Sequence, residues 1–325
     1  MSRSRLFVTG GRGFVGSAVV RRALAAGSSV TLLTRRPDAL PADLASRVTV
    51  VAGELTDRHV IEPALADVEA VVHCARSDDA DLEKRHHIDV EGTRALLDAA
   101  TSAGVPRFVH LSTISVYPIV ASGTIDENTP FGTSSDAYSR DKREVERLVL
   151  STSGITRVVL QPSNIYGPGA NWWSQGLLDV MHKGRVILVN GGSGIANLVH
   201  VDDVAQAIEL AASGRGVNGG RYLLTDGCPR PWREYFEWLE SRLGCAATVS
   251  MTVDEAKQYS AKVRHASLAG RVWLKATRAL TGQLPIFPMD DDAIDRFASG
   301  AVFTIDRARR ELGYEPQVQL ERAPV

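Results

Sequence analysis

Three evenly spaced glycines near the start of the chain constrain its fold more than any other feature. Gly10, Gly13 and Gly16 lie in the stretch VTGGRGFVG, directly after the apolar run RLFVT and directly before a helical pattern. Glycines between a strand and a helix allow a tight turn and let the backbone approach a pyrophosphate, whose charge the helix N-terminus stabilises. An ordinary βα turn that contains glycines is the alternative. The spacing and its context predict a βαβ unit that binds a dinucleotide.

After this loop the chain alternates short β-branched runs with helical patterns, which is typical of a parallel sheet with crossover helices. We therefore predict an α/β fold of the Rossmann type, a doubly wound parallel sheet, with residues 1–170 as the nucleotide-binding domain. The strand-like runs cover residues 5–9, 29–34, 47–51, 69–74, 107–111 and 155–161, and helical patterns between them cover 17–27 and 87–104.

From about residue 170 the alternation of strand-like runs and helical patterns becomes less regular. We predict that residues 171–325 form a smaller region that mostly binds substrate. Segments such as 198–227 are expected to return to the first domain. Within residues 253–300, the stretch 254–282 is basic and partly amphipathic, and we interpret it as a helical cap on the substrate side, with a helix on a lipid surface as the alternative. The elements predicted here are helices over 174–183, 200–212 (capped by an aspartate) and 232–244, and a strand over 221–226.

Composition and charge argue against several classes of protein. The 325 residues carry a formal net charge of −1, which gives no support for a nucleic-acid-binding surface. Cys74, Cys228 and Cys245 lie far apart, which argues against a disulfide framework or a zinc site and for a reducing compartment. No apolar run approaches the ~20 residues of a membrane span, and the N-terminus leaves no room for a signal peptide. We expect a cytoplasmic protein without a membrane span.

The end of the second predicted strand bears on the choice of dinucleotide. An acidic residue there usually binds the adenosine ribose hydroxyl, but this strand ends LLTRRPD, with Thr34, Arg35 and Arg36. A guanidinium binds a phosphate through two hydrogen bonds, whereas a carboxylate repels one. Together with Arg12 in the glycine loop, these arginines predict a 2′-phosphate and therefore a preference for NADP(H) over NAD(H). The alternative interpretation is that Arg35 and Arg36 are solvated charges of a loop.

The stretch AYSRDKREVERL places Tyr138 and Lys142 four residues apart, on one face of a predicted helix. A tyrosine has an ordinary pKa of ~10, and a nearby ammonium favours the phenolate, which suits acid–base work near neutral pH. An exposed pair of common residues is the alternative. Hydroxyl side chains in HLSTISVYP end the preceding strand, at the edge where parallel sheets bind ligands. Such a hydroxyl can polarise a carbonyl or hold an alcohol beside the tyrosine.

Several motifs, in the same order, resemble those of the extended short-chain dehydrogenase/reductases, also called the NAD(P)-dependent epimerase/dehydratase family. TGGRGFVG resembles TGxxGxxG, YSRDK resembles YxxxK, and QPSNIYGPG resembles RPxNVYGPG. VVHCAR at 71–76 resembles VxHxAA, and GELTD, IDVEGTRALLDAA, STISVYP, LVHVDDVAQAI and TIDRARRELGYEP resemble further elements. The chain departs from the family at Glu54, Asp89, Pro118 and Gln161, where the family has Asp, Asn, Gly and Arg.

The resemblance implies a catalytic set of Tyr138, Lys142 and Thr113, with Ser112 just before the threonine. In this set the tyrosine exchanges the proton, the lysine tunes it and holds the nicotinamide ribose, and the threonine positions the oxygen. The cofactor contacts that we predict are Gly10, Arg12, Gly13, Phe14, Val15, Gly16, Arg35, Arg36, Glu54, Leu55, Cys74, Ala75, Tyr138, Lys142, Pro162 and Asn164.

Other stretches favour the reductases and 3β-hydroxysteroid dehydrogenases within this family. Ile114 and Ser115 follow Thr113, where the family's dehydratases carry an acid pair. IAN at 195–197 precedes VHVDD, where nucleotide-sugar enzymes often carry an arginine for a diphosphate. Side chains that suit a less polar substrate are Trp172, Trp173, Trp273 and the LPIF stretch at 284–287, with core packing as the alternative for each.

We therefore expect an NADP(H)-dependent oxidoreductase that interconverts a carbonyl and an alcohol on a small, fairly apolar substrate, with no metal. A nucleotide-sugar epimerase with tightly bound NAD is the first alternative. A non-catalytic NADP(H)-sensing protein is the second. The resemblance also implies a homodimer.

Overall fold

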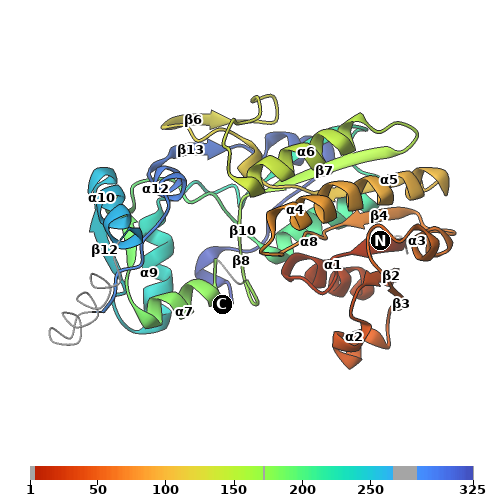
Figure 1. The fold of residues 1–325 in the computed structure, drawn as a ribbon, viewed down its shortest axis with the longest axis horizontal. Coiled ribbons are helices and arrows are strands. Elements are labelled where there is room, and N and C mark those ends of the chain that lie inside the picture. The colour runs from red at the N-terminus through yellow and green to blue at the C-terminus, as the bar shows by residue number, and fades with distance from the viewer. Residues whose placement is uncertain (1–3, 171–172, 266–283, 325) are drawn as a thin grey trace.

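A seven-stranded parallel sheet forms the centre of the larger lobe in this computed structural model, which describes residues 4–170, 173–265 and 284–324 (Figure 1). The predicted Rossmann-type fold is confirmed, and the seven strands end within two residues of their predicted bounds. From one edge to the other they are β11 (Gly220–Leu224), β7 (Thr156–Pro162), β5 (Arg107–Leu111), β4 (Ala70–His73), β1 (Arg5–Thr9), β2 (Ser29–Thr34) and β3 (Thr49–Ala52).

The central strands are rich in apolar residues because helices cover both faces of the sheet. Leu6 and Val8 of β1 pack on one side, and Phe7 between them packs on the other, as the alternation of a strand requires. One face carries α1 (Phe14–Ala25) and α8 (Val201–Ala212), and the other carries α3 (Arg58–Ala64), α5 (Gly92–Ser102) and α6 (Ala137–Ser151). The short helices α2 (Ala42–Ala45) and α4 (Leu82–His86) lie in connections.

The strand order reverses between β1 and β4, because the chain leaves β3 at one edge and returns to the middle of the sheet. At such a point the two connections diverge above the carboxyl ends of the strands, and the crevice between them is the usual ligand site of an open α/β sheet. Thr9, His73 and Leu111 end three neighbouring strands there. The fold therefore places the glycine loop and the hydroxyls after β5 at the same edge.

A smaller lobe lies at the left of Figure 1 and contains α7, α9, α10, α12 and the strand β12. Its largest apolar cluster joins α7 and α9, and the buried side chains of α9 recur at helical spacing at Trp232, Tyr235, Phe236 and Leu239. The helices of this lobe are α7 (Gln175–Lys183), α9 (Trp232–Leu243), α10 (Val253–Arg264) and α12 (Asp291–Ala298), and its strands β9 (Val186–Val189) and β12 (Thr248–Met251) form a parallel pair. Two further parallel pairs lie outside this lobe: β8 (Asn164–Tyr166) with β10 (Leu198–His200), and β6 (Ser122–Ile125) with β13 (Gly300–Phe303).

Two local predictions are wrong. The helix α8 has no aspartate cap: its N-cap is His200, whose Nδ1 atom accepts a hydrogen bond of 3.2 Å from the backbone N–H of Asp202. The first helix begins at Phe14 and not at residue 17, because Gly13 is its N-cap and the glycine loop runs straight into it. The predicted helix over 87–104 forms as a π-helical turn over 87–91 that continues into α5.

The stretch 253–300 contains α10, α12 and the first residue of β13, and its residues 266–283 lie outside the described part of the chain. Within the described ranges, no helix has both the length and the hydropathy needed to cross a membrane.

Candidate active site

A cavity of about 1410 Å³ runs from the glycine loop, along the carboxyl ends of the strands, to α9 and α12 of the smaller lobe. Every catalytic and cofactor-binding residue predicted from the sequence lies on its wall. Residues from β1 and from α12 thus meet around one space, whose volume suits a dinucleotide together with a small second molecule. Their geometry determines what each one can do there.

The glycine loop packs so closely that side chains are excluded from it. Gly10 has a φ of +71°, and a Cβ atom there would stand 2.6 Å from the backbone nitrogen of Ala75. A Cβ atom on Gly16 would stand 2.2 Å from the carbonyl oxygen of Gly10. Among the described residues no side chain caps α1, and its first turn holds no acid. The N–H groups that begin this helix are therefore available to an anion, which fits the pyrophosphate of a dinucleotide.

Three exposed arginines surround the outer end of the cavity. Arg12 comes from the glycine loop, and Arg35 and Arg36 follow β2. The backbone N–H of Arg36 donates a 3.2 Å hydrogen bond to Oγ1 of Thr34, which holds the turn after the strand. None of the three forms an ion pair with a carboxylate in the part of the chain that the structure describes. This end of the site suits a negatively charged group.

The helix α6 carries Tyr138 and Lys142 to the wall of the cavity, one turn apart. Asp136 caps this helix by accepting hydrogen bonds from the backbone N–H groups of Tyr138 and Ser139, at 3.2 and 2.8 Å. Burial acts to raise the pKa of Asp136, but these hydrogen bonds and the charge of Arg296 hold it below its ordinary value. The Nζ atom of Lys142 donates a 3.0 Å hydrogen bond to the carbonyl of Leu111. The cap and this bond orient both side chains.

The ammonium of Lys142 influences the end of β4. Burial, with a further contribution from Lys142, lowers the pKa of His73 to about 3, and its ring nitrogens lie 2.7 Å from Oγ1 of Thr9 and 2.9 Å from Oγ1 of Thr93. Burial raises the pKa of Cys74 to about 12 in spite of Lys142. His73 is therefore a neutral core residue, and Cys74 lines the cavity as a thiol and not as a nucleophile.

Two neighbouring hydroxyls after β5 have different partners. Ser112 donates a 2.5 Å hydrogen bond to Oε2 of the buried Glu146, so its hydroxyl proton is already used within the protein. Oγ1 of Thr113 accepts a 3.2 Å hydrogen bond from the backbone N–H of Ser115 and caps the short 3₁₀ turn that follows. The Thr113 hydroxyl donates a long hydrogen bond of 3.4 Å to Oγ of Ser115, and it can turn from there to a ligand oxygen in the cavity that Thr113 lines. The structure thus favours Thr113 over Ser112 for contact with a substrate.

Glu146 is a residue that the sequence reasoning missed. It is fully buried, and its second oxygen accepts a 2.8 Å hydrogen bond from Gln161, whose Oε1 in turn accepts one from the hydroxyl of Tyr117. Burial raises the pKa of Glu146, although the bonds from Ser112 and Gln161 oppose this. One feature of the sequence could have identified it: Glu146 comes four residues after Lys142, on the same helix. The network joins α6 to the ends of β5 and β7 behind the cavity.

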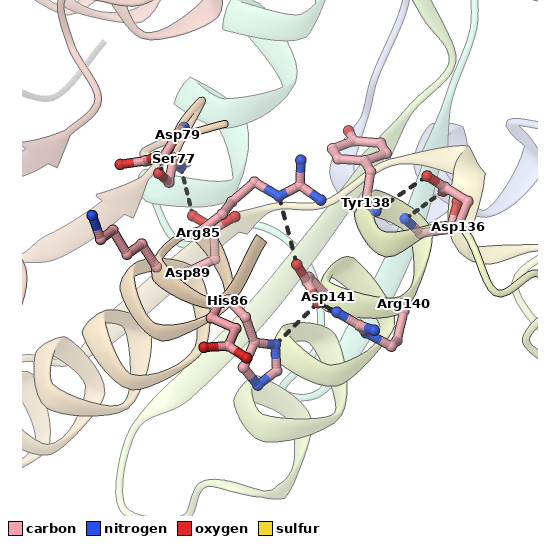
Figure 2. A network of polar contacts seen from close by, with 12 residues as sticks. Ser77, Asp79, Arg85, His86, Asp89, Asp136, Tyr138, Arg140 and Asp141 are labelled. Carbon is pink, nitrogen blue, oxygen red and sulfur yellow. Dashed lines mark hydrogen bonds and ion pairs between the residues drawn. The ribbon is translucent and has the colours of Figure 1, made fainter. Parts of the chain in front are cut away.

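Arginines near Tyr138 were also missed. The guanidinium of Arg76 lies over the ring of Tyr138, with 5.4 Å between Cζ and the ring centroid. Figure 2 shows Arg85 reaching from α4 toward α6, where its Nε atom faces Asp141 at 3.8 Å. Nδ1 of His86 contacts the same carboxylate at 3.0 Å. In the same view Asp89, one of the departures from the family pattern, accepts a 2.6 Å hydrogen bond from the backbone N–H of Ser77 and fixes the loop after β4.

Aromatic side chains of the smaller lobe close the inner end of the cavity. Trp232 stacks on Phe297, with ring centroids 4.3 Å apart, and on Trp173 at 5.1 Å. Trp172 and Trp273, also expected here, lie outside the described residues. The expectation for the LPIF stretch is wrong, because it does not line the cavity: Ile286 forms a bridge to Arg185 and packs in the cluster around β9. The sequence alone did not distinguish apolar side chains that line the cavity from apolar side chains that pack in the core.

Comparison with known proteins agrees with this geometry. A model of the NAD dependent epimerase/dehydratase family matches residues 6–224. A 4-hydroxy-2-methyl-3-oxo-4-farnesyl-3,4-dihydroquinoline-1-oxide ketoreductase of Stigmatella aurantiaca is 32% identical over 97% of this chain and 92% of its own length. A 3-beta-hydroxysteroid dehydrogenase of Mycolicibacterium neoaurum is 28% identical over 98% of this chain and 89% of its own length.

A solved structure extends the comparison to three dimensions. The dTDP-glucose 4,6-dehydratase DesIV of Streptomyces venezuelae, with NAD and TYD bound, has a TM-score of 0.70 at 27% identity, and the match covers 98% of this chain and 95% of that one. Its fold, the family match and the residues gathered around the cavity all agree. The chain therefore belongs to the NAD dependent epimerase/dehydratase family, and it is an NAD(P)-dependent enzyme of the extended short-chain dehydrogenase/reductase type.

Proposed function

We propose that this protein is an NADP(H)-dependent oxidoreductase that interconverts a carbonyl and an alcohol on a small substrate with an apolar body. The observation that carries the proposal is the meeting of Tyr138, Lys142 and Thr113 on one cavity wall, between an uncapped glycine-loop helix and an aromatic pocket. Ile114 and Ser115 follow Thr113, so the acid pair expected of a dehydratase is missing. A reductase needs a proton donor, a group that stabilises the phenolate and a group that positions the oxygen, and Tyr138, Lys142 and Thr113 can supply them.

The cofactor fits the outer part of the cavity. The N–H groups of α1 would hold its pyrophosphate, and Arg12, Arg35 and Arg36 would hold a 2′-phosphate. The other residues that we predict to contact the cofactor also line this part of the cavity: Glu54, Leu55, Cys74, Ala75, Pro162 and Asn164. When bound, the nicotinamide supplies the hydride that reduces the carbonyl carbon. We assign this part to residues 1–170 and most substrate contacts to residues 171–325, with segments such as 198–227 belonging to the first domain.

The residues of the chain handle the proton and the oxygen. The hydroxyl of Tyr138 donates its proton to the carbonyl oxygen as negative charge develops there, and takes it back in the reverse direction. Lys142, held by the carbonyl of Leu111, stabilises the phenolate that remains and reaches the ribose. Thr113 donates a hydrogen bond to the same oxygen and fixes its position. The proposed enzyme acts as a homodimer in the cytoplasm, where its three free cysteines remain reduced.

The proposed function predicts net consumption of added cofactor. Purified protein mixed with NADPH and a panel of ketones and aldehydes should oxidise one NADPH for each carbonyl reduced, followed by the absorbance of NADPH and by product analysis. A nucleotide-sugar epimerase would instead carry tightly bound NAD through purification and need none added. An epimerised sugar without any NADPH consumption would overturn the proposal, and so would a protein that binds NADPH and reduces none of the panel.

The three arginines at the outer end predict the cofactor preference. Wild-type protein should use NADPH at least about tenfold better than NADH in kcat/KM. The double substitution Arg35→Ser with Arg36→Ser removes two charge-assisted contacts of about 1.5–3 kcal/mol each, so KM for NADPH should rise roughly 10²- to 10⁴-fold while KM for NADH changes little. Arg47→Ser, at an exposed arginine away from the cavity, is the control. Equal use of both cofactors by the wild type would refute the prediction.

A further inference from the structure

Two arginines on the inner half of the cavity have no role in the proposed reaction. Arg76 follows β4 and lies over the ring of Tyr138, 5.4 Å from Cζ to the ring centroid. Arg296 belongs to α12 and lines the same cavity. Neither forms an ion pair or a side-chain hydrogen bond with another residue in the described ranges. Arg76 is exposed and Arg296 is half-buried, so both guanidiniums are free to bind an anionic ligand in the cavity.

Both guanidiniums approach the beginning of α6. Ala293, Arg296 and Phe297 line the cavity at the spacing of one helix face, while Ile294 is buried beneath α12. The charge of Arg296 helps to lower the pKa of Asp136, which caps α6 two residues before Tyr138. Arg76 is already above the Tyr138 ring. Two elements that are 220 residues apart in sequence thus bring positive charge to the place where the carbonyl would react.

The acids nearby do not neutralise this charge by direct contact. Asp136 is held by the backbone N–H groups of α6, and Asp89 by the N–H of Ser77. Burial raises the pKa of Asp89 and the charge of Arg76 opposes this rise, but no ion pair forms between them in the described ranges. Asp78 also lies on the cavity wall. Much of the remaining inner wall is apolar, with Ile119 and the stacked rings of Trp173, Trp232 and Phe297.

We propose that Arg76, assisted by Arg296, binds a carboxylate of the substrate, so that the enzyme acts on oxo acids and their hydroxy acids. This inference rests on the proposed function. Because the guanidinium of Arg76 lies over the ring that carries the reacting hydroxyl, the carbonyl bound by Tyr138 and the carboxylate bound by Arg76 belong close together in one small molecule, with no carbon or one carbon between the two groups. The substrate is therefore a 2-oxo or 3-oxo acid, whose apolar chain extends along the aromatic wall.

The test compares an acid with its neutral ester. Oxidation of 3-hydroxyoctanoate and 2-hydroxyoctanoate with NADP⁺ is measured beside that of their methyl esters, since the hydroxy acids are stable in solution. Wild-type protein should prefer at least one acid over its ester by roughly 10- to 100-fold in kcat/KM, as expected for a charge-assisted bidentate contact. Arg76→Met, which keeps an apolar side chain over the ring, should raise KM for the acid by a similar factor and leave the ester unchanged. Arg296→Met should give a smaller change in the same direction.

Arg94→Met, at an exposed arginine of α5 paired with Glu91, is the matched control and should leave all four substrates unaffected. A wild-type enzyme that treats acid and ester alike overturns the inference. It is also overturned if Arg76→Met slows both equally, because the arginine then only supports Tyr138, or if the variant loses affinity for NADP⁺ in a fluorescence titration, because it then binds the cofactor.

A binding measurement separates this inference from the proposed function. If the protein turns over none of these compounds and reduces no carbonyl, the proposed function fails. Calorimetric titration of the acid and the ester into the complex of protein and NADP⁺ then decides the inference: acid-selective binding that Arg76→Met removes supports a carboxylate site, and equal binding contradicts it. Uridine diphosphate is titrated as well, and binding of that anion in place of the hydroxy acids would show a diphosphate site and overturn the proposal.

Discussion

Replacing Tyr138 with phenylalanine is expected to lower kcat for carbonyl reduction by about 10²- to 10⁴-fold, the usual contribution of a positioned general acid. The substitution removes the phenolic oxygen and keeps the ring, so the contact with Arg76 and the cap of α6 by Asp136 are preserved. The dissociation constant of NADPH, measured by fluorescence titration, should change less than about twofold, because the groups assigned to the cofactor are otherwise intact.

Tyr259→Phe is the control for this change, because Tyr259 lies on α10, outside the cavity, and donates its hydrogen bond to the carbonyl of Ile286. It should lower kcat little. Thermal unfolding of both variants verifies that they fold. A Tyr138→Phe protein that keeps more than about a tenth of the wild-type kcat would show that another group donates the proton, and the catalytic assignment would then be wrong.

The second large effect is expected on stability, at Glu146. Its carboxylate is fully buried and accepts hydrogen bonds from Ser112 and Gln161, with Arg221 at 3.7 Å. Glu146→Leu leaves these polar partners buried without an acceptor, and removing one member of a buried polar network typically costs about 3–5 kcal/mol of the free energy of unfolding. Denaturant unfolding at neutral pH measures the loss.

Glu144→Leu provides the matched control on the same helix. The side chain of Glu144 is 47% exposed, and its one charged partner among the residues that the structure describes is His86, at 3.9 Å, so the expected change is within about 0.5 kcal/mol. Equal losses in the two variants would show that the buried network contributes nothing specific. Loss of less than about 1 kcal/mol in Glu146→Leu would contradict the prediction in another way, by showing that the partners find new acceptors or water.

The pH dependence of the network has a definite sign. Burial raises the pKa of Glu146, so its neutral form is favoured in the folded protein. The stability it contributes is complete below the ordinary glutamate pKa of about 4.3 and is lost as pH rises through the raised value. Glu146→Gln does not titrate, and the advantage of the wild type over this variant should therefore shrink from about pH 4.5 to pH 8. An advantage that grows over this range would mean that the ionised form is the stabilised one.

Local patterns were sufficient to predict the sheet and the core of the site. The seven strands follow from short β-branched runs, and the glycine loop follows from its position between a strand and a helix. Tyr138 and Lys142 were found because a spacing of four places two side chains on one helix face. These features depend on residues close in sequence, so periodicity and turn chemistry reveal them.

Other predictions needed information that a local pattern does not contain. The LPIF stretch and Trp173 are both apolar, yet only Trp173 faces the cavity. Hydrophobicity predicts burial and does not say against which neighbour a side chain packs. The cap of α8 was misjudged for a similar reason: Asp203 accepts hydrogen bonds from the backbone of Gln317 and Val318, near the end of the chain.

The sequence by itself determined that this chain folds as a doubly wound sheet, carries a dinucleotide loop and holds a tyrosine–lysine pair, because each depends on the order of neighbouring residues. Only the tertiary structure decided that the hydroxyl of Ser112 donates to the buried Glu146 while that of Thr113 caps the turn after β5, although both residues line the cavity. It also brought Arg76 to the ring of Tyr138, and Arg296 close enough to influence Asp136, the cap of α6. Such contacts join segments far apart in the chain, and their formation depends on how whole elements pack and not on any pattern within one of them.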